Sequence, residues 1–535
     1  MKKFMLIAIL ILATILRFYQ LNTLPALNAD EAAIGYNAYS LISTGKDEHG
    51  HPWPIHFESF GDFKPGLFFY LVLPFVWLLG LNEWAVRVPG ALLGVGTVFL
   101  MYLLVGYFSP KKNFQLLATM LLAISPWHIH FSRGGWEVNA GTFFIVLGLW
   151  LFLKGFNNYR WWMWSTLALV ASFYTYHSAR IVVPLLLLWL LVFYRQQLWS
   201  NRKKLLLPVA LGIILLIPLV RDFTGPAGNS RASGVSIFAD LGVTLRINVE
   251  RGEHGNNRSF PALIFHNKVV NFGYEFLSNW GEHFWGEFLF ISGDEIQRNK
   301  VPEFGVLYLV QLPFLIIGFL AIARSSTGWG VILWWLMVAP AAAALTFQSP
   351  HALRAHNMLI PLTIITAYGL NKILEWKYTY RWVVVLIFLL LSWDFSRYLH
   401  QYYAHMAKEY PFSSQYGVKE LVSYINQNYD KYPEFIITDR YDQPYILFLF
   451  YMNYPPQKFQ GEHNLSVRDK FGFSTVRDFD KFHFQPITKE VLEKSKGNVV
   501  VGAASEVGNY ANIIHVINFP NGKEAFKIVA NQYEQ

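Results

Sequence analysis

Two neighbouring carboxylic acids, Asp30 and Glu31, follow the first long apolar run of the chain. An ionised carboxylate beside a hydrophobic wall at a bilayer surface is costly unless another group uses it. One interpretation is a catalytic base held at the membrane face, where it deprotonates a hydroxyl. The other is that the two acids cap a short amphipathic interfacial helix over residues 31–41 and favour its positive end. The local pattern by itself favours capping.

Four further polar patches lie between apolar runs and carry the cations that bind phosphate. Residues 62–66 place Lys64 before a Pro-Gly turn, and residues 132–137 place Arg133 four positions before Glu137. The last two patches, 174–180 and 351–356, contain Tyr176, His177, Arg180, His351, Arg354 and His356. Arginine, lysine and histidine at a membrane surface suit a lipid phosphate or pyrophosphate, and neighbouring acids can deprotonate or orient an acceptor hydroxyl. The five patches therefore contain the residue types that a phosphate-linked sugar reaction needs.

Each patch also has a simpler interpretation. Arg133 and Arg180 can extend from helix ends towards the headgroups, the histidines can be satisfied interfacial residues, and Glu137 can cap the helix that follows it. The five patches occur together on one face of the membrane, with positive and negative side chains interleaved, and this is harder to explain in this way. A divalent metal held by the acids and histidines is conceivable, although no helical His-x-x-x-His spacing occurs. The sequence indicates no cofactor, and it does not decide whether a divalent metal ion binds.

The composition assigns these patches to a membrane protein. Of 535 residues, 53% are hydrophobic and only 15% are charged, whereas a soluble chain carries about a quarter charged residues. The net charge of +9 lies largely in short loops, so it predicts orientation and contact with anionic headgroups and not nucleic-acid binding. Cysteine is absent, which excludes disulfides and thiol nucleophiles. The predicted class is a polytopic α-helical membrane protein.

About eleven spans are predicted, beginning with an uncleaved N-terminal run because Arg17 interrupts it and no small-x-small site follows. The later spans are 86–108, 114–131, 138–155, 161–176, 181–195, 205–220, 303–323, 329–347, 357–374 and 381–394. Segment 66–80 is marginal for a crossing and is predicted to lie in the interface or to re-enter. The positive-inside rule then puts the N-terminus and residues 202–204 in the cytoplasm, and all five patches outside the inner (plasma) membrane.

Composition changes near residue 396. Residues 1–395 are predicted to form the transmembrane domain, with outer loops 22–83 and 221–302. Residues 396–535 have ordinary charge density and predict a small extracytoplasmic α/β domain. Within it we expect a helix over 417–428, strands over 434–438 and 498–501, and a hairpin over 513–528 that turns at residues 520–522.

The order of the patches resembles a known family. Leu16-Arg17, Asp30-Glu31, Lys64-Pro65, residues 84–92, Ser132-Arg133 and Glu137 together resemble the N-terminal half of GT-C type membrane glycosyltransferases. The nearest branch is that of the bacterial relatives of protein O-mannosyltransferases and of the lipid A aminoarabinose transferases. The resemblance covers about residues 10–200, and residues 288–314 with the Arg354 patch extend it more weakly.

The resemblance implies an inverting transferase that takes a sugar from a polyprenyl-phosphate donor. Asp30 matches the family's first-loop base and Glu31 its neighbour. Lys64 matches a lysine before proline that approaches the donor phosphate, and Arg133 an arginine before the second acidic position. Glu137 stands where an aspartate is usual, and its longer side chain leaves its role, orienting or metal-linked, open.

The residue pattern and the family resemblance together predict that Asp30, Glu31 and Glu137 are catalytic. The donor phosphate is expected to bind to Lys64, Arg133, Arg180 and Arg354. Further substrate contacts are expected from Tyr176, His177 and His351. The expected partners are the lipid-linked sugar, a lipid, glycan or protein acceptor, and the bilayer. Two other classes compete with this hypothesis. A lipid-linked glycan flippase would need charges at mid-membrane, and few occur there. A non-catalytic glycan-binding scaffold would keep its function without Asp30.

Overall fold

The computed structural model describes residues 2–225, 235–325, 328–376, 380–468, 473–495, 497–510 and 512–530. By internal packing the chain divides into two units, each described by itself. Unit 1 comprises Met1–Arg17, Leu92–Ser132 and Glu137–Leu399. Unit 2 comprises Phe18–Ala91, Arg133–Trp136 and His400–Gln535.

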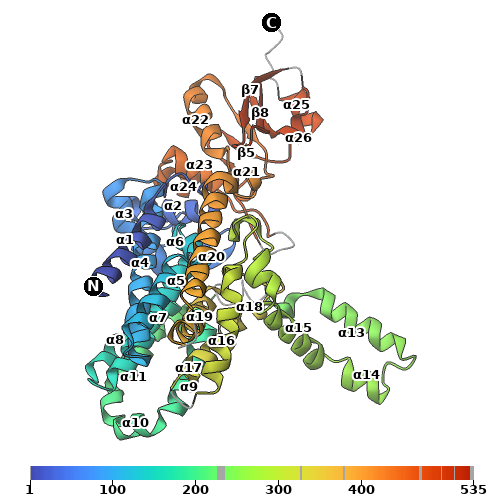
Figure 1. Ribbon diagram of the computed structural model, residues 1–535. Coiled ribbons are helices and arrows are strands. Elements are labelled where there is room, and N and C mark those ends of the chain that lie inside the picture. Colours follow the sequence, from blue (N-terminus) through green and yellow to red (C-terminus); the bar gives the residue numbers. More distant parts are fainter. Residues whose placement is uncertain are drawn as a thin grey trace. The chain divides into compact units, whose positions relative to one another are not determined.

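The described part of unit 1 is helical (Figure 1). Its apolar helices, which wholly or mostly belong to the unit, are α1 (Lys2–Phe18), α4 (Glu83–Phe108), α5 (Lys112–Ala123), α7 (Glu137–Gly155), α8 (Arg160–Phe173), α9 (Ala179–Phe193), α11 (Arg202–Phe223), α16 (Leu312–Ala323), α17 (Gly330–Val338), α19 (Leu359–Glu375) and α20 (Arg381–His400). Shorter helices connect or extend them: α6 (Pro126–Ser132), α10 (Arg195–Ser200) and α18 (Ala341–Ala344). Three more helices, α13 (Leu241–Glu253), α14 (Phe260–Phe265) and α15 (Lys268–Glu282), project together beside α18.

Hydropathy runs located most of these helices correctly. In the described chain, four helical stretches are long and apolar enough to cross a membrane by length and composition: Glu83–Phe108, Glu137–Gly155, Arg202–Asp222 and Arg381–Glu409. Further apolar helices are shorter, among them Ala179–Phe193 and Leu309–Ala323. The predicted number of spans, about eleven, stays a prediction.

Three predicted spans are interrupted. Span 114–131 ends as α5 at Ala123 and resumes as α6, span 303–323 becomes an α-helix only at Leu312, and span 329–347 breaks after Val338. The third break coincides with Pro340, whose ring cannot continue a regular helix. Continuous hydropathy therefore concealed turns in the chain.

Helix α16 packs closely against α19 through glycines. A Cβ on Gly318 would lie 1.9 Å from the carbonyl oxygen of Ile365, and one on Gly369 would lie 2.0 Å from that of Phe314. Neither position has room for a side chain. Such small-residue contacts let two backbones approach where both helices are apolar, as is typical of membrane helix pairs.

Unit 2 joins the first loop to the C-terminal part of the chain. The loop forms α2 (Ala29–Thr44), the antiparallel strands β1 (His56–Ser59) and β2 (Asp62–Pro65), and α3 (Leu67–Leu79). The C-terminal part contributes the helices α21 (Met406–Glu409), α22 (Val418–Asn428), α23 (Pro444–Met452), α24 (Pro456–Glu462), α25 (Lys489–Lys494) and α26 (Ala504–Val507). It also contributes the strands β3 (Phe435–Ile437), β4 (Asp478–Phe479), β5 (Phe482–Phe484), β6 (Val499–Ala503), β7 (Ile513–Asn518) and β8 (Glu524–Ala530).

The C-terminal strands form one mixed sheet in the order β4-β5-β3-β6-β8-β7. Strand β3 is parallel to β5 and β6, and β8 pairs antiparallel with β6 and β7. Ile436, Val500 and Val529 from three of its strands pack with Ile487, Leu492 and Val507. The predicted helix, both strands and the 513–528 hairpin are all present. The predicted domain boundary near residue 396 stays a prediction.

One prediction about the first loop is wrong. Residues 31–41 were expected to lie along a membrane interface, yet α2 is buried along most of its length inside unit 2. It packs against α3, α23 and α24, and the Tyr36 hydroxyl donates to the carbonyl oxygen of Tyr454 at 3.0 Å. Its apolar residues therefore face protein, because the C-terminal part of the chain covers them.

Candidate active site

The two acids at the start of α2 have different surroundings, although they are adjacent in sequence. Asn28 is the N-cap, and its side chain accepts the Glu31 N–H at 3.1 Å while Glu31 Oε2 accepts the Asn28 N–H at 3.3 Å. This reciprocal capping box satisfies two amide donors at the helix end. The capping interpretation is thus confirmed for Glu31. Asp30 lies in the same first turn but takes no part in the box.

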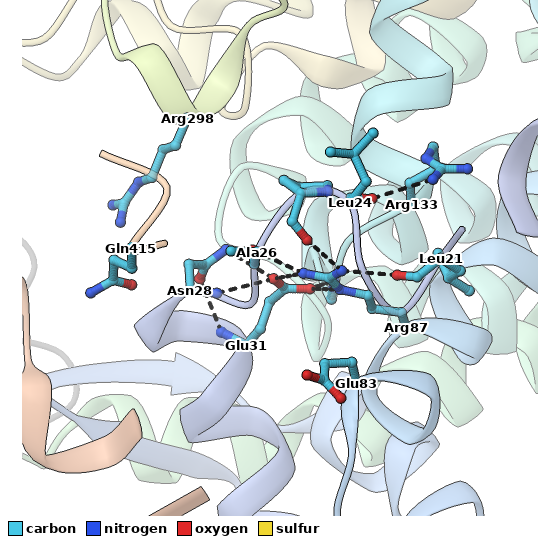
Figure 2. A network of polar contacts seen from close by, with 12 residues as sticks. Leu21, Leu24, Ala26, Asn28, Glu31, Glu83, Arg87, Arg133, Arg298 and Gln415 are labelled. Carbon is cyan, nitrogen blue, oxygen red and sulfur yellow. Dashed lines mark hydrogen bonds and ion pairs between the residues drawn. The ribbon is translucent and has the colours of Figure 1, made fainter. Parts of the chain in front are cut away.

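Glu31 also forms a buried ion pair with Arg87 near the start of α4 (Figure 2). Arg87 Nε and Nη2 each donate to one carboxylate oxygen at 2.7 Å, and the Gly135 N–H donates to Oε1 at 2.8 Å. Arg87 Nη1 also donates to the carbonyl oxygens of Leu21 and Pro25 at 2.9 and 2.8 Å, and Nη2 donates to that of Ala26 at 3.1 Å. The pair joins four segments of unit 2, so Glu31 holds the start of α2 in place.

Asp30 faces a more open environment. Its carboxylate accepts a hydrogen bond from Lys64 Nζ, and the two side chains are 24% and 14% exposed respectively. Lys64 lies on β2 opposite Phe57 of β1, and its ammonium group lies 5.4 Å from the centre of the Phe60 ring. The hairpin therefore presents the lysine to the acid. This pair offers a base that a hydroxyl can reach, beside a cation that can receive a phosphate.

A third acid, Glu48, is fully buried and interacts electrostatically with Lys64. Its Oε1 accepts from Asn37 Nδ2 at 3.0 Å, and its own N–H donates to Asn37 Oδ1 at 2.9 Å. Among the described residues its Oε2 has no hydrogen-bond partner. Burial raises the pKa of Glu48 to about 8, so this acid is mostly protonated at neutral pH.

Two histidines, His49 and His463, form a hydrogen-bonded pair beside Glu48. His463 Nδ1 contacts the Phe459 carbonyl at 2.7 Å, and a carbonyl can only accept, so this nitrogen carries the proton. Its Nε2 then accepts from His49 Nδ1 at 2.9 Å, which leaves His49 Nε2 as an acceptor 3.8 Å from Glu48 Oε1. Burial lowers the pKa of His49 to about 3, so both rings are neutral in this arrangement.

Arg133, predicted to bind phosphate, is fully buried in unit 2. Its Nε donates to the Tyr402 hydroxyl at 3.1 Å, and its Nη2 donates to the carbonyl oxygens of Gln20 and Leu24 at 3.4 and 3.2 Å. The guanidinium also lies 5.1 Å from the Tyr402 ring centre. A phosphate would compete with these bonds, so its predicted role stays a prediction.

The predicted residues of the 174–180 patch and Glu137 lie in unit 1. Glu137 is the first residue of α7 and is buried. Arg180 Nη1 lies 3.0 Å from His177 Nδ1, and its Nε donates to the Phe173 carbonyl at 3.3 Å. Tyr176 is buried beside them. The structure thus brings together the members of this patch.

The last patch, also in unit 1, centres on an acid without a predicted role. Asp294 Oδ2 accepts the Ala352 N–H at 2.7 Å and lies 3.5 Å from His351 Nδ1. Burial raises the pKa of Asp294, and the charge of Arg354 opposes that rise. Arg354 itself donates to the Thr346 hydroxyl at 2.6 Å. His351 therefore contacts an acid, and this pair is a candidate for binding a polar ligand.

The predicted residues are divided between the two units. Asp30 lies with Lys64, and Glu31 forms its own pair in the same unit, whereas Arg180 and Arg354 belong to unit 1. That one cavity is lined by the four predicted phosphate-binding residues stays a prediction; these are Lys64, Arg133, Arg180 and Arg354. In the described parts of the chain, no group of three or more His, Cys, Asp or Glu side chains is placed to hold a metal ion.

Sequence reasoning gave no role to Arg87 or Glu48. Arg87 was part of the segment that carries the family resemblance, and an arginine at the start of a long apolar run needs a buried acid or carbonyl partners. That signal was available. Glu48 had no comparable signal, because only the folded loop buries it.

The comparisons agree with the predicted resemblance. Residues 64–221 match a family model described as dolichyl-phosphate-mannose-protein mannosyltransferase. The chain is 31% identical over 172 residues to an uncharacterized protein of Aquifex aeolicus, covering 32% of this chain and 33% of that protein. It is 24% identical over 204 residues to the putative mannosyltransferase YycA of Bacillus subtilis, covering 37% of this chain and 28% of that protein. The matches therefore span about a third of these relatives' length.

The fold is similar over nearly the whole chain to that of a solved structure. ArnT from Cupriavidus metallidurans, bound to undecaprenyl phosphate, matches with a TM-score of 0.55 and 11% identity, covering 98% of this chain and 97% of ArnT. The resemblance to GT-C type membrane glycosyltransferases is confirmed, and the chain has the fold of a multi-pass membrane protein.

Proposed function

We propose that this chain is an inverting GT-C type glycosyltransferase, which moves a sugar from a polyprenyl-phosphate donor to an acceptor hydroxyl at the extracytoplasmic membrane face. The observation that carries the proposal is the partly exposed Asp30–Lys64 pair at the start of a helix that a buried ion pair fixes in place. The family match over residues 64–221 and the ArnT fold support the same reaction class. The N-terminus would then be cytoplasmic, and the C-terminal sheet extracytoplasmic.

The reaction assigns different tasks to the two groups of the pair. The acceptor hydroxyl oxygen attacks the anomeric carbon, and Asp30 takes its proton as the general base. The bond between that carbon and the phosphate oxygen breaks, and the electron pair leaves with polyprenyl phosphate. Lys64 lies close enough to Asp30 to hold the phosphate and offset its growing negative charge. The inversion follows from a single displacement, so no covalent sugar–enzyme intermediate forms.

Asp30→Asn tests this role. Asparagine keeps the size of the side chain and can still accept a hydrogen bond from Lys64, but it is not a base. We expect roughly 10²–10⁴-fold slower transfer, with an unchanged unfolding midpoint. The measurement is transfer from polyprenyl-phosphate mannose, labelled in the sugar, to acceptors in the membranes of producing cells. Mannose is chosen because the matching family's description names it.

Asp62→Asn is the matched control, since Asp62 is an acid of the same loop whose Oδ1 accepts the N–H of Phe63, as asparagine also can. It should transfer sugar at the parent rate. A fully active Asp30→Asn protein would instead favour a transporter or a glycan-binding scaffold, because neither needs a base at this position.

A further inference from the structure

Unit 1 carries a helical arm whose apolar side chains are not covered by the rest of the described unit. The arm comprises α13, α14 and α15, residues 241–282, and projects from the bundle beside α18 (Figure 1). Helices α13 and α15 pack against each other, and α14 connects them. None of the roles assigned above falls on these helices.

Exposed apolar residues recur at helical spacing on the two longer helices of the arm. On α13, Leu241, Leu245 and Val249 recur every four residues, and Leu245 is 62% exposed. On α15, Tyr274 and Leu277 continue the same kind of row and are 66% and 62% exposed. The full set of exposed large apolar residues is Leu241, Leu245, Val249, Phe260, Leu263, Ile264, Phe265, Val269, Val270, Tyr274 and Leu277. We call this set the apolar stripe.

Several charged groups of the arm bond to other residues of the arm. Arg246 of α13 lies 3.5 Å from the Glu275 carboxylate of α15. Glu250 lies 2.7 Å from His266 Nδ1, and Arg251 donates to the His266 carbonyl at 2.6 Å. Val243 and Ile247 fill the interior between the helices. These charged groups therefore pair within the hairpin, while the apolar stripe is left outside.

The base of the arm is fastened to an apolar bundle segment. Trp280 of α15 donates its indole N–H to the Met337 carbonyl at 2.8 Å, and Asn279 donates to the carbonyl oxygens of Ala344 and Thr346 at 3.3 and 3.1 Å. Met337 and Ala344 belong to the apolar helical segment Gly330–Ala344. In a multi-pass protein such a segment suits membrane depth, so the arm begins next to a helix whose composition fits the bilayer.

We propose that the arm lies in the interfacial region of the bilayer, with the apolar stripe towards the acyl chains. An isolated helix with one apolar face is stabilised there by burial of that face, and tyrosine and tryptophan favour the same depth. A group of exposed apolar residues of this size marks a membrane or protein contact. The connection to an apolar bundle helix favours lipid over a soluble partner.

The cysteine-free chain allows a direct test. Single cysteines at Leu245 and Tyr274 are labelled with an environment-sensitive fluorophore, and the full-length protein is reconstituted into phosphatidylcholine vesicles. As controls, single cysteines are introduced and labelled at Arg246, on another side of the same helix, and at Ser505 in the C-terminal part of the chain. We expect brominated phosphatidylcholine to quench Leu245 and Tyr274 several-fold more than Arg246 or Ser505, and iodide to show the reverse order.

Two outcomes would overturn the proposal. Quenching of the Leu245 and Tyr274 labels by iodide but not by brominated lipid would show that the stripe faces water. Protection of these labels from both quenchers would show that protein covers the stripe, such as a second copy of the chain. Each labelled protein must first elute at the same volume as the unlabelled protein. A variant that does not is misfolded, and its quenching is not interpreted.

Discussion

Two ion pairs that begin at adjacent residues of α2 differ in almost every physical respect. The Glu31–Arg87 pair is excluded from solvent and bidentate, and further hydrogen bonds complete both partners. The Asp30–Lys64 pair is partly exposed, and its cation comes from a two-stranded hairpin. Successive side chains on a helix point about 100° apart. One acid therefore enters the protein interior, whereas its neighbour faces the exposed side.

The difference separates a fixed support, Glu31, from the proposed base, Asp30. A buried charge with every lone pair used cannot take a proton from a substrate without breaking its own network. A partly exposed carboxylate such as that of Asp30 is open to a substrate hydroxyl. We therefore assign Asp30 as the proposed base and Glu31 as a positioning residue, although the resemblance had placed both among the catalytic residues.

The largest effect on stability should come from breaking the buried pair. Glu31→Gln leaves Arg87 charged and buried without a counter-ion, which typically costs about 3–5 kcal/mol. We expect a lower unfolding midpoint, measured by intrinsic tryptophan fluorescence in detergent. Asp30→Asn should leave that midpoint unchanged, since a partly exposed pair contributes little to stability.

The double variant Glu31→Gln/Arg87→Met sharpens this contrast. It removes both charges, so it should be more stable than Glu31→Gln alone if the cost comes from the unpaired arginine. A Glu31→Gln protein with the parent midpoint would remove the distinction between the two pairs.

The next effect concerns donor binding at the exposed pair. Lys64→Gln keeps the length of most of the side chain but removes the charge, and hydrogen bonds to charged groups are worth about 1.5–3 kcal/mol. We expect roughly a 10–100-fold loss in kcat/KM for the polyprenyl-phosphate sugar, with the KM for the acceptor nearly unchanged. The measurement is a titration of each substrate in turn. Lys46→Gln, an exposed lysine of the same loop, serves as the control. An equal loss for both substrates would contradict the phosphate role.

The sequence predicted elements whose stabilising contacts are local. The helix Val418–Asn428 and the hairpin β7–β8 appear where residue periodicity and the Pro-Asn-Gly turn placed them. Contacts between distant segments could not be read in this way. Arg87 meets Glu31 across 56 positions, and Tyr36 meets Tyr454 across 418. For the same reason the sequence misjudged the surroundings of α2, and the role of Asp30 stays a prediction.

The smallest effect concerns Glu48, which is buried like Glu31 but has no lysine or arginine bonded to it among the described residues. Its pKa in the folded protein is raised from 4.5 to about 8 by burial, so the folded state binds the proton more tightly than the unfolded state. The stabilising contribution is therefore fully present below pH 4.5 and is lost as pH rises through about 8. From pH 7 to pH 9 we expect the parent to lose about 1 kcal/mol more than Glu48→Gln, which cannot ionise. The measurement is the free energy of unfolding in detergent at both pH values. Glu493→Gln, an exposed position in the same unit, should follow the parent. Parallel losses in the parent and in Glu48→Gln would contradict a folded-state pKa near 8 for Glu48.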